Sequence, residues 1–180
     1  MRKVLISSFD MEVGGVERSL ISMLNNFDYD DNEVDLMLYS HTGDFIHLLT
    51  NKVNLLDEID KYATFRKGIG QTIKEGNYSL GMVRLFSKFL AKVRGIKNKV
   101  AEDGIYQMQL MWKYSLPFLP KVDKEYDVAI SYLWPHYFVA EKVKAKRKIA
   151  WIHTDYSTIE TDISMDLKMW NKFDYIMAVS

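Results

Sequence analysis

The beginning of the chain constrains the fold most strongly, because an apolar run leads through a two-glycine loop into a segment with helical periodicity. Residues 4–9 form the apolar run, and apolar side chains between residues 16 and 27 recur at helical spacing. The loop between these segments ends in Gly14 and Gly15. A strand, a loop and a helix in this order are typical of the start of a nucleotide-binding type of α/β domain.

Gly14 and Gly15 are compatible with two roles for this loop. Glycine lacks a Cβ atom, so its backbone N–H group can lie close to a ligand, and the helix that follows directs a partial positive charge at an anion. A phosphate group is therefore one expected occupant. The other interpretation is that the glycines only form the tight turn between strand and helix.

Five further apolar runs alternate with segments of helical periodicity. The predicted strands are residues 34–39, 53–56, 126–133, 148–152 and 175–179, and the predicted helices are residues 44–50, a segment that follows Trp134 and Pro135 and reaches Lys144, and residues 160–171. Apolar strands separated by helices predict a parallel sheet covered on both faces. We expect a single Rossmann-like α/β domain over residues 1–180.

Residues 57–121 interrupt this alternation with helical patterns, so we expect a helical insertion there. No acidic residue occurs between Gly76 and Ala101, whereas this stretch has six basic ones. On a helical wheel the large apolar residues share one arc and most of the basic residues share another. The apolar arc is Met82, Leu85, Phe86, Phe89, Val93, Ile96 and Val100, and the basic residues are Arg84, Lys88, Lys92, Arg94, Lys97 and Lys99.

This pattern has two interpretations. The helix can pack on the sheet with a solvated basic face, or it can lie on an anionic membrane surface or line a groove for an anionic lipid-linked substrate. In the second case Arg84, Lys88 and Lys92 are the expected contact residues.

The composition excludes several classes of protein. With 24 basic and 24 acidic residues the chain has no net charge to attract nucleic acid, and without cysteine it forms neither disulfides nor thiolate metal sites. The first apolar run is too short for a signal peptide or a membrane span. We therefore expect a cytoplasmic polypeptide.

In an open parallel sheet, ligands bind at the carboxyl ends of the strands. The residues expected to line this crevice are Ser8, Phe9, Asp10, residues 39–41, residues 132–136 including His136, His153, Thr154 and Asp155. His153 and Asp155 are the candidates to act on a substrate hydroxyl, because histidine exchanges protons near neutral pH. A purely structural role for His153 remains open.

Several familiar nucleotide sites do not match the spacing. A dinucleotide-binding unit needs a third glycine and an acidic residue closing the second strand, and a P-loop needs Gly-Lys-Ser/Thr. The chain has neither. Asp28 and Asp30 match the paired-aspartate metal motif of some sugar transferases, but they lie at the amino end of the predicted sheet. We expect no metal and no resident cofactor.

Five segments, taken in order, resemble the N-terminal domain of family 4 glycosyltransferases of the GT-B fold. They are residues 1–9, 14–19, 127–131, 151–155 and 174–180. The likeness is weakest across residues 57–121.

Members of that family transfer a sugar from a nucleotide sugar to an acceptor with retention of configuration, usually without a metal. Two Rossmann-like domains face each other, and the C-terminal one holds most of the donor. The resemblance implies that this chain is the acceptor-side half of an enzyme of cell-surface polysaccharide or glycolipid synthesis, acting on a glycan or lipid-linked acceptor. The donor domain, with its paired-glutamate motif, is absent from the chain, so we expect the chain alone to be inactive.

The resemblance also implies roles for single residues. Gly14 and Gly15 would approach the donor diphosphate and the acceptor, and His153 would contact the transferred sugar or the acceptor. Glu17 and Arg18 match the motif without an assigned role. The complete candidate set is His153 and Asp155 for catalysis, and Gly14, Gly15, Asp10, Glu17, Arg18 and His136 for substrate binding.

Two alternatives remain open. The chain can be a noncatalytic module that binds a nucleotide, a sugar or a partner domain in the same crevice, or a membrane-docking element with residues 82–100 as its contact surface. The expected location is the cytoplasm, with the inner face of a membrane as a peripheral site.

Overall fold

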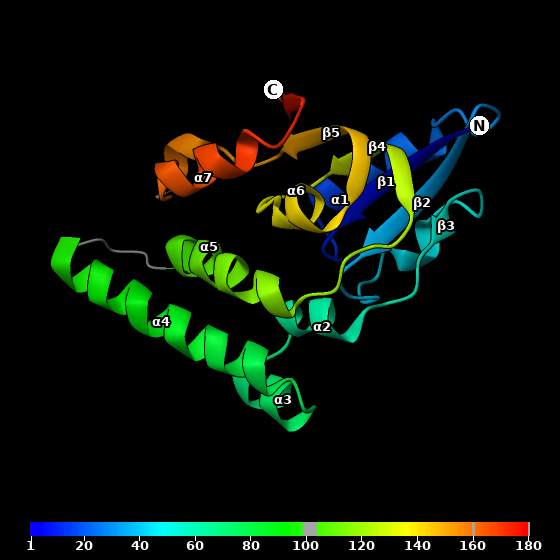
Figure 1. Cartoon of the computed structure of the whole chain (residues 1–180). Helices are drawn as coiled ribbons and strands as arrows, with labels where there is room; N and C mark the ends of the chain where they lie inside the picture. Colours follow the sequence, from blue (N-terminus) through cyan, green and yellow to red (C-terminus); the bar gives the residue numbers. More distant parts are fainter. Residues whose placement is uncertain (99–103, 160, 180) are drawn as a thin grey trace.

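In the computed structural model, a single parallel sheet is flanked by helices (Figure 1). The structure describes the backbone of residues 1–98, 104–159 and 161–179, and the side chains of these residues except 95–98. The strands are β1 (Arg2–Ser8), β2 (Asn32–Leu38), β3 (Asn54–Leu55), β4 (Glu125–Ser131), β5 (Lys144–Ile152) and β6 (Tyr175–Ala178). The α-helices are α1 (Gly15–Asn25), α2 (Asp60–Ala63), α3 (Ile69–Lys74), α4 (Tyr78–Asn98), α5 (Gly104–Ser115), α6 (Tyr137–Lys142) and α7 (Ile163–Trp170). Short 3-10 helices are η1 (Ile46–Leu48), η2 (Thr64–Arg66), η3 (Leu116–Phe118) and η4 (Tyr156–Thr158).

The strand order is β3-β2-β1-β4-β5-β6, and every pairing is parallel. Strand β1 is central, because Val4 pairs with Val34 of β2 on one side and with Val128 of β4 on the other. The chain therefore adds strands outward in both directions from β1. The direction in which strands are added reverses between β1 and β4, and open α/β sheets form a ligand crevice at such a point. The prediction of a Rossmann-like parallel sheet is confirmed.

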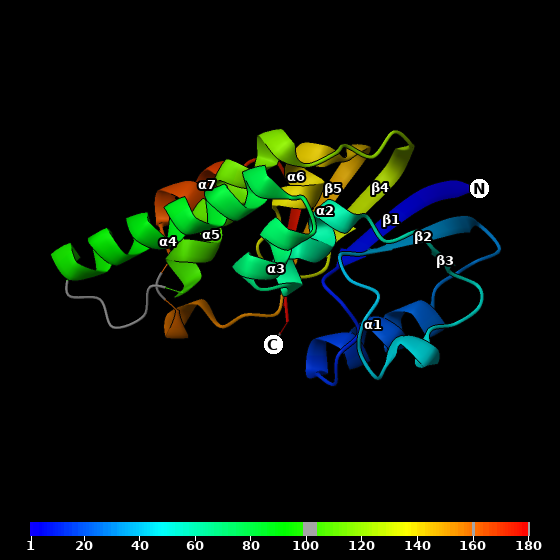
Figure 2. The same cartoon turned by 90° about the horizontal axis from the view of Figure 1, so that it is seen from below.

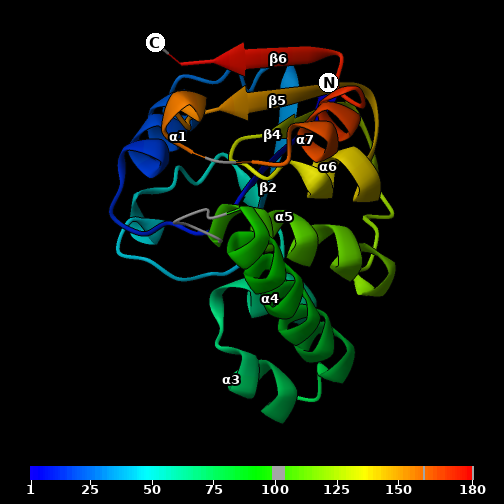
Figure 3. The same ribbon diagram turned by 90° about the vertical axis from the view of Figure 1, so that its left-hand side faces the viewer.

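Alternating side chains of β1 face the two sides of the sheet, as strand geometry requires. Val4 and Ile6 join the core cluster that contains Leu20 and Leu24 of α1. Leu5 joins the cluster that the other helices cover. Figure 3 shows α1 on one side of the sheet and α6 and α7 on the other, so both faces are covered as predicted.

The insertion of residues 57–121 is helical, and its described residues contain no strand, as predicted. An aromatic cluster joins it to the sheet. Trp112 of α5 is fully buried and stacks on Phe65 of η2, with ring centroids 4.1 Å apart. The ring centroid of Tyr39, which follows β2, lies 5.4 Å from that of Trp112 and 5.5 Å from that of Tyr62 of α2. Helix α4 packs on α5 and α3 as an outer layer (Figure 2).

Several boundaries differ from the prediction, and β5 begins at Lys144, four residues earlier than expected. The helix expected at residues 44–50 is only the 3-10 turn η1. The helix expected to reach Lys144 ends at Lys142, because Lys144 pairs with Glu125 of β4 and begins β5. The helix expected from residue 160 begins at Ile163, where the Asp162 side chain accepts from the Met165 N–H at 3.2 Å. Residue 160 itself lies outside the described residues.

Gly43 fixes the approach of two loops at the carboxyl edge of the sheet. Its φ is 108°, a region that L-residues rarely adopt, and a Cβ atom there would overlap the backbone of Met11. Two backbone hydrogen bonds of 2.9 Å hold this approach: Met11 N–H donates to the Thr42 carbonyl, and Phe45 N–H donates to the Met11 carbonyl. The loops after β1 and β2 are therefore locked together.

Replacing Gly43 with alanine should lower the free energy of unfolding by about 1–3 kcal/mol, because the side chain meets both backbone strain and the Met11 backbone. Urea unfolding measures the change. Gly70→Ala is the matched control: Gly70 lies in α3 with no atom within 4 Å of an added Cβ, and alanine should stabilise the helix by about 0.5–1 kcal/mol. Equal stability of Gly43→Ala and the parent chain would contradict the role given to Gly43.

Candidate functional site

The candidate site lies where β1, β4 and β5 end beside the N-terminal turns of α1. Tyr132, directly after β4, donates its backbone N–H to the Ser7 carbonyl at 2.9 Å. Its hydroxyl lies 2.8 Å from the Ser19 hydroxyl of α1, and its ring centroid lies 4.6 Å from that of His153, which follows β5. Tyr132 thus links the first helix to the end of β5. The sequence placed Tyr132 and His153 in the crevice, but Ser19 carried no signal beyond its place in the glycine-loop motif.

His153 is half-buried, and its Nε2 atom is buried without a hydrogen-bond partner among the described atoms. Burial lowers the pKa of its imidazole below the ordinary value. A neutral imidazole at neutral pH can accept or donate one hydrogen bond through Nε2. His153 is therefore a neutral, half-buried group at the carboxyl edge of the sheet.

His136 is fully buried, at 0% exposure, so it lies in the core rather than on the wall of the crevice. Its Nδ1 atom lies 2.8 Å from the Ser131 hydroxyl, and its ring packs edge-on against Phe173. Burial, and secondly repulsion from the His153 imidazolium once that ring is protonated in acid, lowers the pKa of His136 to about 3. A direct substrate contact was predicted for His136. In the structure His136 is instead a buried, uncharged side chain that packs behind the crevice.

Asp155 is exposed and is engaged in the turn that follows β5. Its Oδ1 atom accepts from the Ser157 N–H at 2.9 Å and from the Ser157 hydroxyl at 2.7 Å. These hydrogen bonds lower the pKa of Asp155, so the carboxylate is ionised. The side chain caps η4, and this structural role accounts for an aspartate at position 155 without a catalytic role.

In the loop before α1, free space lies beside Gly15 but not beside Gly14. Glu17, nine-tenths buried, lays its carboxylate against Gly14, in the space that a Cβ atom there would occupy. A negative group therefore already lies at the N-terminus of α1, where a phosphate was expected. No atom lies within 4 Å of the corresponding position at Gly15, and Arg18 is exposed with its guanidinium 5.6 Å from the Phe45 ring centre.

Asp10 joins the crevice to the insertion rather than standing free for a ligand. It is 1% exposed and forms an ion pair with Arg66 of η2, whose guanidinium lies 5.2 Å from the Phe9 ring centre. The Glu12 N–H also approaches Asp10 Oδ1, at 3.4 Å. No sequence pattern identified Arg66 as the partner, because the two residues lie on different elements.

The residues that follow β2 contribute less to the crevice than predicted. Tyr39 is 2% exposed and belongs to the aromatic core, so its hydroxyl does not face solvent. His41 is half-buried, and its backbone N–H donates to the Glu58 carboxylate at 2.5 Å.

A cavity of about 500 Å³ adjoins the segment after β5. It is lined by Tyr156, Ile159, Thr161, Ile163, Asp166 and Trp170. Asp166 is 2% exposed, burial raises its pKa, and its Oδ1 atom accepts from Gln109 at 2.8 Å. Its Oδ2 atom has no partner among the described atoms. The sequence did not single out Asp166, because a lone aspartate in an amphipathic helix looks like a surface residue.

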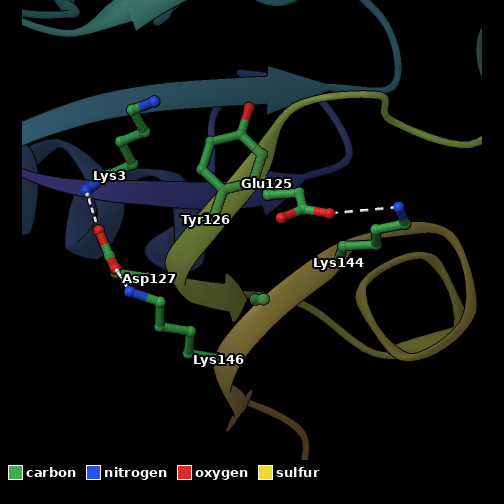
Figure 4. A pocket seen from close by; sticks show the side chains of 7 residues that line it. Lys3, Glu125, Tyr126, Asp127, Lys144 and Lys146 are labelled. Atoms are coloured by element: carbon green, nitrogen blue, oxygen red, sulfur yellow. Dashed lines mark hydrogen bonds and ion pairs between the residues drawn. The ribbon is translucent and has the colours of Figure 1, made fainter.

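Another pocket, of about 460 Å³, lies at the amino ends of β1, β4 and β5 (Figure 4). Asp127 accepts there from the Lys3 backbone N–H at 2.8 Å and from Lys146 Nζ at 2.6 Å, and Glu125 pairs with Lys144 at 3.2 Å. Both acids are thus paired, and the pocket lies at the opposite edge of the sheet from His153. It is not the predicted crevice.

Within residues 1–98, 104–159 and 161–179, no group of three or more His, Asp or Glu side chains is arranged to hold a metal ion. None of the helices in the described parts of the chain combines the length and apolar character needed to cross a bilayer.

Comparison with protein-family models, with curated proteins and with solved structures gave no match.

Buried His136 should make stability depend on pH. Its pKa in the folded chain, about 3, lies below the value of about 6.5 expected for the unfolded chain, so the unfolded chain binds more protons between these values. Stability is therefore full above about pH 6.5 and falls with decreasing pH, by about 2–3 kcal/mol between about pH 7 and pH 4.5.

Denaturant unfolding at a series of pH values checks this expectation. His136→Asn, with a side chain that does not titrate, should lose most of the decrease, whereas His47→Asn should keep it because His47 is exposed on η1. The same pH dependence in His136→Asn and the parent chain would show that other groups control acid stability.

Proposed function

We propose that this chain is the acceptor-side, N-terminal domain of a retaining GT-B glycosyltransferase, as the resemblance to family 4 implies. The enzyme would transfer a sugar from a nucleotide sugar to a glycan or lipid-linked acceptor. The observation that carries the proposal is the convergence of the glycine loop, Tyr132 and His153 at the carboxyl edge of the sheet, beside the strand-order reversal.

The chemistry of these groups suits an anionic, hydroxyl-rich substrate. Gly15 offers open backbone and Arg18 an exposed guanidinium, so a diphosphate would approach from their side rather than over Gly14, where Glu17 lies. His153 would meet a sugar hydroxyl with the part of its half-buried ring that is exposed. A neutral imidazole can orient such a hydroxyl without adding charge.

The cavity beside η4 is a suitable place for the acceptor. The rings of Tyr156 and Trp170 offer apolar surface, and Asp166 adds a carboxyl group that Gln109 holds in place. This combination of flat apolar surface and a fixed acceptor is suited to a sugar unit.

The proposal also requires a partner domain that carries the donor site. Strand β6 is compatible with such a partner, because Tyr175, Ile176 and Met177 are each between 46% and 56% exposed. Exposed apolar side chains on an edge strand can contact another part of the protein. The location that belongs to the proposal is the cytoplasm, at the inner face of a membrane where glycolipid or polysaccharide is made.

The first test is the intact mass of the native polypeptide in its source cells, by immunoblot and mass spectrometry. A product near twice the 21.1 kDa of this chain would support a two-domain enzyme. A product that ends at Ser180 would favour the noncatalytic binding module, which predicts instead that the chain alone binds a nucleotide or sugar tightly.

In the longer protein, His153→Ala should lower the rate of transfer by roughly a hundredfold, because a positioned histidine contact at the reacting centre contributes about that much. Release of nucleoside diphosphate from a panel of nucleotide sugars measures the rate. His47→Ala, on the exposed turn η1, is the matched control and should keep full activity. Full activity of a folded His153→Ala variant would remove His153 from the site, and no release from any donor would contradict the transferase itself.

A further inference from the structure

Helix α4 exposes a stripe of large apolar side chains. The stripe consists of Met82, Leu85, Phe86, Phe89 and Val93, each between 45% and 63% exposed. Their spacing of three or four residues places them along one face of the helix. The Phe86 ring also contacts Tyr114 of α5, with centroids 5.5 Å apart, so it forms the inner margin of the stripe.

The opposite face of α4 packs on the protein with smaller and more polar residues. Leu80, Ser87 and Ala91 are buried. Arg84 points inward, where it donates to the Thr64 carbonyl at 2.7 Å and to the Thr72 hydroxyl at 3.1 Å. The expectation that Arg84 belongs to a basic outer surface is therefore wrong, because its guanidinium joins α4 to the rest of the insertion.

The exposed charges beside the stripe are positive. Lys88 and Lys92 are exposed, as expected for a contact surface. Arg94 instead pairs with Asp162 at 3.0 Å and covers the Tyr106 ring. Ile96, Lys97, Lys99 and Val100 lie outside the described side chains. The sequence has no acidic residue between Gly76 and Ala101.

This arrangement reverses the usual packing of an amphipathic helix, whose large apolar side chains face the core. The large apolar side chains of the stripe are instead exposed, and α4 itself lies in the outer layer of the molecule (Figure 2). The apolar side chains are thus available to a partner, and the positive charges of Lys88 and Lys92 beside them favour a negatively charged one.

We propose that α4 docks in the plane of an anionic lipid bilayer, with Met82 and Phe89 inserted among the lipids and Lys88 and Lys92 at the headgroups. A helix with one exposed apolar face and a cationic margin is suited to such an interface. A second copy of the chain fits less well, because two such faces would bring lysines together without an acid on either stripe. The docking requires no nucleotide sugar, so it stands or falls separately from glycosyl transfer.

The test is sedimentation of the 180-residue chain with vesicles of phosphatidylcholine alone and of phosphatidylcholine mixed with phosphatidylglycerol. We expect binding to the mixed vesicles and much weaker binding to the neutral ones. Lys88→Glu/Lys92→Glu should weaken binding to the mixed vesicles by about thirtyfold or more. Met82→Ser/Phe89→Ser should weaken it about tenfold or more through lost apolar contact.

Matched controls change the same residue types elsewhere on the surface. Lys52→Glu/Lys168→Glu alters the net charge equally, and Leu48→Ser/Leu167→Ser removes two other exposed apolar side chains. Both controls should bind as the parent chain does. Absence of binding to the mixed vesicles, or equal losses in the controls and the α4 variants, would overturn the proposal. A parent dimer that the α4 variants dissociate, without vesicle binding, would assign the stripe to a second copy and overturn it as well.

Discussion

The pairing of β1 with both β2 and β4 is the constraint on which the rest of the structure depends. A central parallel strand is buried on both faces, so it requires helices on each side and apolar residues at nearly every position. Val4, Leu5 and Ile6 meet this requirement, since Val4 and Ile6 pack toward α1 and Leu5 toward the insertion. The same double pairing places the ends of β1 and β4 side by side, which is why Tyr132 reaches both α1 and His153.

Much of the fold could be predicted from apolar periodicity, because strand and helix repeats are local properties of the sequence. The parallel sheet, the helical insertion and the crevice edge were predicted from such patterns. Partnerships between distant elements were not: Arg66 binds Asp10, Arg84 turns inward, and Tyr39 joins an aromatic core. Each depends on how the insertion packs against the sheet, and a helical wheel does not contain that information. The wheel separates two faces of α4 but does not say which one is buried.

The candidate site was predicted better in position than in the state of its side chains. The sequence located His153, His136 and Asp155 near one another, but burial and hydrogen bonding give them different properties. His136 is neutral and enclosed, His153 is half-buried with an unpartnered Nε2, and Asp155 is ionised and caps a turn. Only the environment of each group makes this distinction. The same holds for Glu17, whose carboxylate changes which glycine of the loop is open.

The exposed strand β6 has a practical consequence for work with this chain. It is the last strand in the sheet order, so one of its edges has no neighbour among the described residues. Its apolar side chains and its free backbone groups together form a template on which a strand of another molecule can pair. Concentrated preparations of the chain are therefore at risk of edge-to-edge aggregation, and a charged residue introduced on the outer edge of β6 is the direct remedy.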